Sequence, residues 1–295
     1  MILYKYKSIT PQSGENALID NDNMKRAGTL TTDRQSEKDR NRIAQILVEN
    51  KIYYSNVKQL NDPFECRLKL QIPEDVHGRR ELAVASLTNS TLSPKEKRKE
   101  IARLTSKLKD NPELAEKFYT DNLAKFSETF GFHCLSKKNN SPVMWAHYGG
   151  NLKGLCIGFK CSEVLTQEED AFDEDFGRGL PVKYKTDLPV VEMPLVKPGM
   201  KDQVDATIKL LLGTKSKEWE YEDEYRYIKK NNEGGSGLHS FPCSKIQEII
   251  IGPFMEIAEK EFILSIAREH LPDTRCYTSK ISDTEYSVVK DEQIT

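Results

Sequence analysis

Two glutamates separated by one residue, Glu222 and Glu224, are the strongest candidates for chemistry in this sequence. They lie in EWEYEDEYRYIKK, residues 218–230, where acidic and aromatic residues alternate. Because side chains alternate between the faces of a strand, both carboxylates would share a face with Arg226, which could neutralise Glu224. Such a pair suits a general base or an electrostatic stabiliser. The alternatives are a solvated acidic face or an exposed edge strand.

A second candidate site is SPVMWAHYGGNLKGLCIG, residues 141–158. One helical turn would place Trp145 and Tyr148 on the same side and His147 on another. The glycines that follow would allow close approach to the backbone. Two aromatic rings, a histidine and glycines could hold a flat heterocycle such as adenine or nicotinamide. Alternatively, the aromatic residues belong to the core and the glycines form turns.

Two early strand patterns, ILYKYK and IYYS, carry further polar candidates. They offer hydroxyl and amino groups to a ligand: Tyr4, Lys5, Tyr54 and Ser55. Ordinary aromatic packing within the strands is the alternative.

Common motifs for phosphate, zinc and serine chemistry are missing. The sequence contains no GxxxxGK[ST], HExxH or GxSxG, and no GxGxxG between a strand and a helix. Its five histidines do not pair at i, i+4, so we expect no metal. The six cysteines form no CxxC pair, which is typical of reduced thiols in a cytosolic protein.

The composition indicates a globular protein, and its overall charge gives no argument for nucleic-acid binding. The net charge is -2 and the pI is about 6.3, so any basic surface must be local. The N-terminus lacks the apolar run of a signal peptide, and no apolar stretch approaches the length of a membrane span. We therefore predict a cytoplasmic location and no membrane contact.

Short strand patterns and several helical patterns occur without regular alternation, which favours an α+β fold over a doubly wound parallel sheet. Residues 9–40 predict a loop, and Ile43, Ile46 and Leu47 then mark one face of a helix. Residues 79–128 contain three helical patterns, whose Lys/Arg run we interpret as a solvated face. We predict one domain over residues 1–295, with mixed, mostly antiparallel sheets and a helical insertion at 79–128.

Five segments in order resemble a widespread bacterial domain family of unknown function that is often found in genes linked to phage defence. They are LYKYKS, IYYSNVKQLNDPFE, FHCLSKKNNSPVMWAHYGGNLKGLCIGF, WEYEDEYRYI and IQEIIIGP. The layout is similar to that of ADP-ribosyltransferase-like folds. Such folds have a basic or polar residue on an early strand, Ser or Tyr on a second strand, and Glu-x-Glu on a late strand.

This resemblance implies a role for each candidate. Lys5 or Tyr4 would stand where such enzymes usually have Arg or His, and Ser55 would fill the second position. The late Glu-x-Glu would be Glu222 and Glu224, with Glu224 catalytic. NAD would be the substrate, and its bond to nicotinamide would break through an oxocarbenium-like centre that a carboxylate stabilises.

The remaining contacts to NAD follow from the same resemblance. Trp145 and Tyr148 would stack on nicotinamide, and Lys5 or Arg226 would hold a phosphate. The protein would be a toxin or effector in anti-phage defence, with nucleic acid or protein as acceptor and a cognate antitoxin or defence-system partner.

Two alternatives belong to other classes. A metal-dependent nuclease would bind Mg²⁺ through Asp62, Glu65, Glu222 and Glu224. A non-catalytic sensor or partner-binding protein would instead use the helical insertion as its contact surface.

Overall fold

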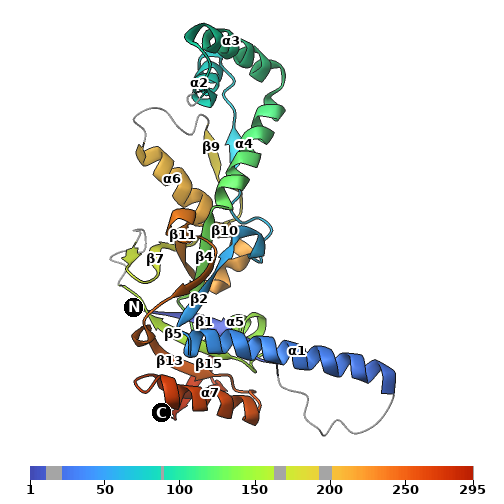
Figure 1. The fold of residues 1–295 in the computed structure, drawn as a ribbon, viewed down its shortest axis with the longest axis vertical. Helices are drawn as coiled ribbons and strands as arrows, with labels where there is room; N and C mark the ends of the chain where they lie inside the picture. Colours follow the sequence, from blue (N-terminus) through green and yellow to red (C-terminus); the bar gives the residue numbers. More distant parts are fainter. Residues whose placement is uncertain (11–21, 88–89, 163–170, 193–200, 295) are drawn as a thin grey trace. The chain divides into compact units, whose positions relative to one another are not determined.

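The computed structural model describes residues 1–10, 22–87, 90–162, 171–192 and 201–294 (Figure 1). The chain divides into two compact units. Unit 1 comprises Met1–Tyr54, Phe132–Pro181 and Glu220–Thr295, and unit 2 comprises Ser55–Gly131 and Val182–Trp219.

An 11-stranded sheet forms the centre of unit 1. Its strands are β1 (Ile2–Lys7), β2 (Lys51–Asn56), β4 (Phe130–Ser136), β5 (Leu155–Lys160), β6 (Ala171–Asp173), β7 (Gly177–Pro181), β11 (Glu224–Lys230), β12 (Gly237–Ser240), β13 (Ile246–Ile251), β14 (Arg275–Ile281) and β15 (Val288–Gln293). The main path runs β15-β14-β13-β5-β1-β4-β11-β7-β6, while β2 pairs with β4 and β12.

The sheet is mixed and largely antiparallel, as predicted. β1 runs antiparallel to both β4 and β5, and its Tyr4 lies opposite Ser136 on one side and Gly158 on the other. β5 and β13 are also antiparallel, whereas β13 and β14 are parallel. The expectation of an α+β fold is confirmed.

Two helices cover one face of the sheet. They are α1 (Asp22–Leu47) and α7 (Ile257–His270), which lie alongside each other (Figure 1). Arg40 of α1 makes a 2.7 Å ion pair with Glu259 of α7, whose side chain is buried. This contact joins the two helices on the sheet.

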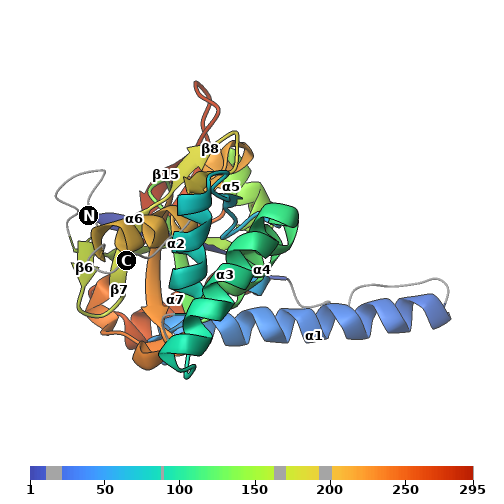
Figure 2. The ribbon, with the colours of Figure 1, turned by 90° about the horizontal axis from the view of Figure 1, so that it is seen from above.

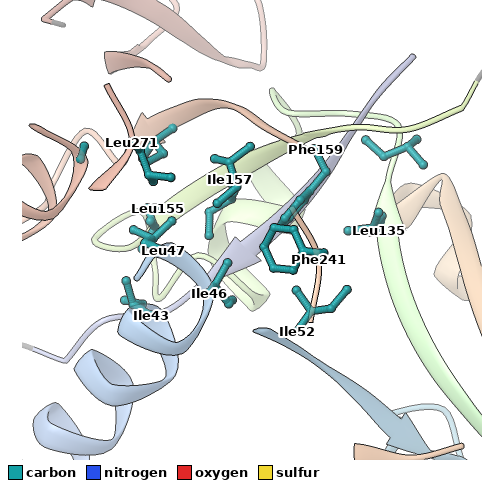
Figure 3. Packing of buried hydrophobic residues seen from close by; sticks show 14 of the residues in the cluster. Ile43, Ile46, Leu47, Ile52, Leu135, Leu155, Ile157, Phe159, Phe241 and Leu271 are labelled. Carbon is teal, nitrogen blue, oxygen red and sulfur yellow. The ribbon is translucent and has the colours of Figure 1, made fainter. Parts of the chain in front are cut away.

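The main core lies between these helices and the sheet. Ile43, Ile46 and Leu47 point from α1 toward Leu155 and Ile157 of β5 (Figure 3). All five side chains are almost completely buried. Burial of each such side chain stabilises the fold by about 1.5–3 kcal/mol, so this helix face is a principal source of stability.

The opposite face of the sheet carries a smaller cluster under α5 (Pro142–His147). Alternation along β1 sends Leu3 into the main core and Tyr6 into this second cluster, where it meets Met144 and Trp145 of α5. The predicted site residues Trp145 and Tyr148 therefore pack on this second face of the sheet.

Unit 2 contains helices and two small parallel strand pairs. Its elements are β3 (Lys69–Gln71), α2 (Val76–Ser86), α3 (Pro94–Asp110), α4 (Pro112–Ser127), β8 (Lys183–Lys185), β9 (Val190–Glu192), α6 (Lys201–Leu212) and β10 (Thr214–Ser216). β3 pairs with β9, and β8 pairs with β10. The three helices predicted between residues 79 and 128 are present, with α3 packed between α2 and α4 (Figure 2).

The loop predicted for residues 9–40 is wrong from Asp22 onward, because α1 begins there; residues 11–21 lie outside the described residues. Two of the buried positions of this helix are polar, Ser36 and Asp39. Asp39 accepts hydrogen bonds of 2.8 Å from Thr10 and from Gln35. Since these inward positions are not apolar, no helical hydrophobic pattern marks this stretch.

Candidate functional site

The short helix α5 presents the first half of the candidate site. Ser141 caps it by accepting a hydrogen bond from the Met144 amide, and Pro142 occupies its first position. The helix ends after His147, and Gly150 adopts a positive φ of 59° in the turn that follows. One helical turn thus brings His147 and Tyr148 to the end of the element.

The glycines after α5 serve the packing of the backbone. A Cβ atom on Gly154 would lie 2.0 Å from the Lys7 carbonyl oxygen of β1. The close approach that the sequence predicts at this glycine is therefore made by the neighbouring strand.

The second half of the site comes from a segment for which the sequence pattern predicts a strand. Residues Lys217–Glu222 form a 3₁₀ helix instead, and β11 starts only at Glu224. Between them Asp223 has a φ of +44° and donates its amide to the Glu220 carbonyl. This left-handed residue interrupts the alternation on which the strand prediction rested.

Glu222 and Tyr148 meet at the centre of the site. The Tyr148 hydroxyl donates a 2.6 Å hydrogen bond to Glu222 Oε1, and Glu222 is only 5% exposed. The Ser136 hydroxyl of β4 donates to the Glu222 carbonyl at 2.6 Å. Next to it, His147 Nδ1 and the Tyr221 hydroxyl form a 3.0 Å hydrogen bond. The candidate base is thus held by two other elements of unit 1.

Glu224 forms a buried ion pair with Arg226. Arg226 Nε and Nη2 donate to the two Glu224 carboxylate oxygens at 2.9 and 3.1 Å, and Arg226 is fully buried. The guanidinium also lies 5.4 Å from the centre of the Phe132 ring. The predicted neutralisation of Glu224 by Arg226 is present, and the fork geometry is the strong form of this contact.

The reading of these acids as a solvated face on an exposed edge is wrong for Glu222 and Glu224. Both are buried, and β11 lies between β4 and β7 inside the sheet. Glu218 and Glu220 of the same stretch are exposed. The two halves of the acidic stretch therefore have different environments.

The first-strand candidates Tyr4 and Lys5 make different contacts. Tyr4 donates a 3.0 Å hydrogen bond to Glu248. Burial raises the pKa of the Tyr4 hydroxyl, and the negative charge of Glu248 raises it further. Lys5 Nζ donates to the Cys134 carbonyl at 2.8 Å. Burial and the nearby Glu224 raise the pKa of the Cys134 thiol, so this cysteine stays protonated near neutral pH.

Glu248 is a buried charged residue that the sequence interpretation missed. It is 1% exposed, and Lys290 Nζ contacts both of its carboxylate oxygens at 3.0 and 2.9 Å. The signal was a single acid within the apolar segment IQEIIIGP, since a charge in a buried strand requires a partner. Its partners lie far away in the sequence and could not be read from the strand itself.

Tyr54 and Trp145 are core residues. The Tyr54 hydroxyl donates to the Phe176 carbonyl at 2.7 Å, and its ring belongs to the main core. Trp145 is completely buried, with its ring 5.2 Å from that of Tyr6 and its Nε1 donating to the Asn139 carbonyl at 2.9 Å. Ser55 belongs to unit 2.

The nuclease alternative gains no support from these contacts. Asp62 and Glu65 belong to unit 2, where Glu65 pairs with Lys215 at 3.6 Å. Among the residues whose positions are described, no group of three or more His, Cys, Asp or Glu is arranged to hold a metal ion. Over the same residues, no helix combines the length and apolar character needed to span a membrane.

Residues 144–227 match DUF2971, a family of proteins of unknown function. This match supports the predicted resemblance to a domain family of unknown function. The DUF2971 segment starts in α5 and ends in β11. The hydrogen bond between Tyr148 and Glu222 therefore joins residues near the two ends of this segment. No curated protein and no solved structure matches the chain.

Proposed function

We propose that this protein is an ADP-ribosyltransferase-like enzyme that uses NAD as its substrate. The observation that carries the proposal is the buried Glu222 carboxylate held by the Tyr148 hydroxyl at 2.6 Å. A carboxylate fixed in this way can stabilise the positive charge that develops on the ribose when the bond to nicotinamide breaks. The hydrogen bond orients the carboxylate before the reaction, which lowers the cost of reorganisation.

Of the two glutamates predicted as catalytic, the geometry favours Glu222. Both oxygens of Glu224 hold the Arg226 guanidinium, which neutralises its charge inside the sheet. We therefore assign Glu224 and Arg226 the role of fixing the start of β11, directly after Glu222. The resemblance by itself implies Glu224 instead.

Positive charge for the pyrophosphate of NAD is available near Glu222. Lys138 and Lys137 lie 3.6 and 4.0 Å from the carboxylate of Asp223, the residue that follows Glu222. Both lysines are partly exposed, so they can exchange this weak surface pair for a phosphate. Arg226 is fully buried and bound to Glu224, and Trp145 is completely buried. We therefore assign neither residue a contact with NAD.

The biological setting rests on the resemblance alone. It suggests a toxin or effector of anti-phage defence acting in the cytoplasm on nucleic acid or protein, together with a cognate antitoxin or defence-system partner.

The test is release of labelled nicotinamide from NAD by the purified protein. Glu222→Gln keeps the size and the hydrogen-bond acceptor but removes the charge, and we expect release to fall about 100-fold. Glu220→Gln, at an exposed neighbour, is the matched control and should keep wild-type release. Equal release by wild type and Glu222→Gln, or no release by wild type, would refute the proposal, and the second result would favour the non-catalytic alternative.

A further inference from the structure

A cavity of about 170 Å³ lies within unit 2, beside the parallel pair β8–β10. Its lining includes three cations, Arg67, Lys185 and Lys215, but only one acid, Asp187. An excess of positive charge at a concave surface favours an anionic ligand. None of these residues belongs to the Glu222 site.

Hydroxyl groups complete the polar lining of this cavity. Thr186, Thr214 and Ser216 contribute to it, and the register of the strand pair places Ser216 directly beside Lys185. In the structure the Thr186 hydroxyl donates to Asp187 at 3.2 Å. Cations combined with hydroxyl donors are the groups that bind phosphate oxygens.

Lys215 is held in the lining by neighbouring side chains. Its side chain is 7% exposed and lies 3.6 Å from Glu65, with the Trp219 ring 4.8 Å from its ammonium group. The ion pair with Glu65 and the contact with the Trp219 ring fix the ammonium group in place. Lys215 therefore adds a fixed positive charge to the lining of the cavity.

An exposed aromatic ring stands at the same cavity. Phe64 lines it and is 54% exposed, and the Arg67 guanidinium lies 5.6 Å from the centre of its ring. An aromatic face next to a cation is the arrangement on which nucleobases stack in single-stranded nucleic-acid sites.

We propose that this cavity binds the phosphate of a nucleotide, with the base stacked on Phe64. The cavity is smaller than the roughly 300–1,000 Å³ of pockets that enclose whole small molecules, so the base remains outside the phosphate site. A second, more open hollow of about 440 Å³ shares residues 185–189 and adds Lys217. The positive charges of Lys185 and Lys217 would allow a nucleic-acid strand to continue from the cavity into this hollow. The bound phosphate therefore belongs either to a free nucleotide or to a single strand.

Fluorescence anisotropy of the full-length protein with a labelled single-stranded DNA tests this site. Arg67→Ala/Lys185→Ala changes two exposed side chains, and we expect it to raise Kd at least about tenfold. Lys95→Ala/Lys99→Ala on α3 makes the same change of net charge at exposed positions away from the cavity lining and should leave Kd within about twofold. An equal loss in both double variants, or no binding of either the labelled DNA or labelled AMP by wild type, would overturn the proposal.

Competitors identify the source of the phosphate. Displacement of the DNA by AMP would indicate a nucleotide site, while resistance to AMP with full sensitivity to Arg67→Ala/Lys185→Ala would indicate a strand. Phe64→Ala should weaken DNA or AMP binding and leave competition by inorganic phosphate unchanged. Glu222→Gln should bind DNA as wild type does, which separates this site from the proposed NAD chemistry.

Discussion

The Tyr148 hydroxyl lies 2.6 Å from Glu222 Oε1 and links the turn after α5 to the residue that precedes the bend into β11. The two residues are 74 positions apart in the chain. A buried carboxylate that accepts a short hydrogen bond is held in one orientation, so this contact sets the direction in which Glu222 can act.

Loss of the Tyr148 hydroxyl should affect both activity and stability. Tyr148→Phe leaves the buried Glu222 without this donor, so we expect stability to fall by about 1–3 kcal/mol and nicotinamide release to fall at least about tenfold. Chemical unfolding and the NAD assay measure the two effects. Tyr286→Phe is the control, because Tyr286 is fully exposed. Unchanged release by Tyr148→Phe would remove the basis for assigning Glu222.

Arg226 should be essential to the stability of the sheet. Arg226→Leu removes the guanidinium that pairs with the buried Glu224 charge, and we expect a loss of about 3–5 kcal/mol in urea unfolding. Glu224→Leu/Arg226→Leu removes both charges and should be more stable than the single variant. Lys138→Ala, which removes a partly exposed pair with Asp223, should cost less than about 1 kcal/mol. A single variant as stable as wild type would contradict the buried pair.

Trp145 should act through packing. Trp145→Ala removes a completely buried indole that packs on Tyr6, and we expect a loss of about 3–5 kcal/mol. Phe172→Ala, at a largely exposed ring, should stay within about 0.5 kcal/mol of wild type. Thermal unfolding of the two variants gives the comparison. A Trp145→Ala protein with wild-type stability but weaker NAD binding would restore the ligand-stacking role.

Stability should fall in mild acid because of His133. Burial holds the pKa of this histidine well below its usual value of about 6.5, and the positive charges of Lys5 and Lys7 lower it further. Below that value the unfolded chain binds a proton that the folded protein does not, so the contribution of neutral His133 is lost as pH decreases. His133→Phe should show a smaller loss of stability between pH 7 and pH 5.5 in urea unfolding. An identical pH dependence in variant and wild type would refute this assignment.

The sequence by itself determined the local features of this protein. Ser93 and Glu96 form the capping box that starts α3, with the Glu96 carboxylate accepting from the Ser93 amide at 2.9 Å. Arg226 pairs with Glu224 because residues two apart share a face of a strand. The apolar run of β5 is buried, as its composition predicts. Each of these depends on neighbours within a few residues, which is the range over which a pattern can be read.

Only the tertiary structure decided which distant groups meet. Asp39 can face inward on α1 because Thr10 and Gln35 donate hydrogen bonds to its carboxylate, so the helix carries no apolar pattern there. Glu222 is defined as a candidate base by Tyr148, and Glu248 is neutralised by Lys290. A buried polar side chain is stable only where a partner is present, and a partner on another element has no periodic relation to it in the sequence.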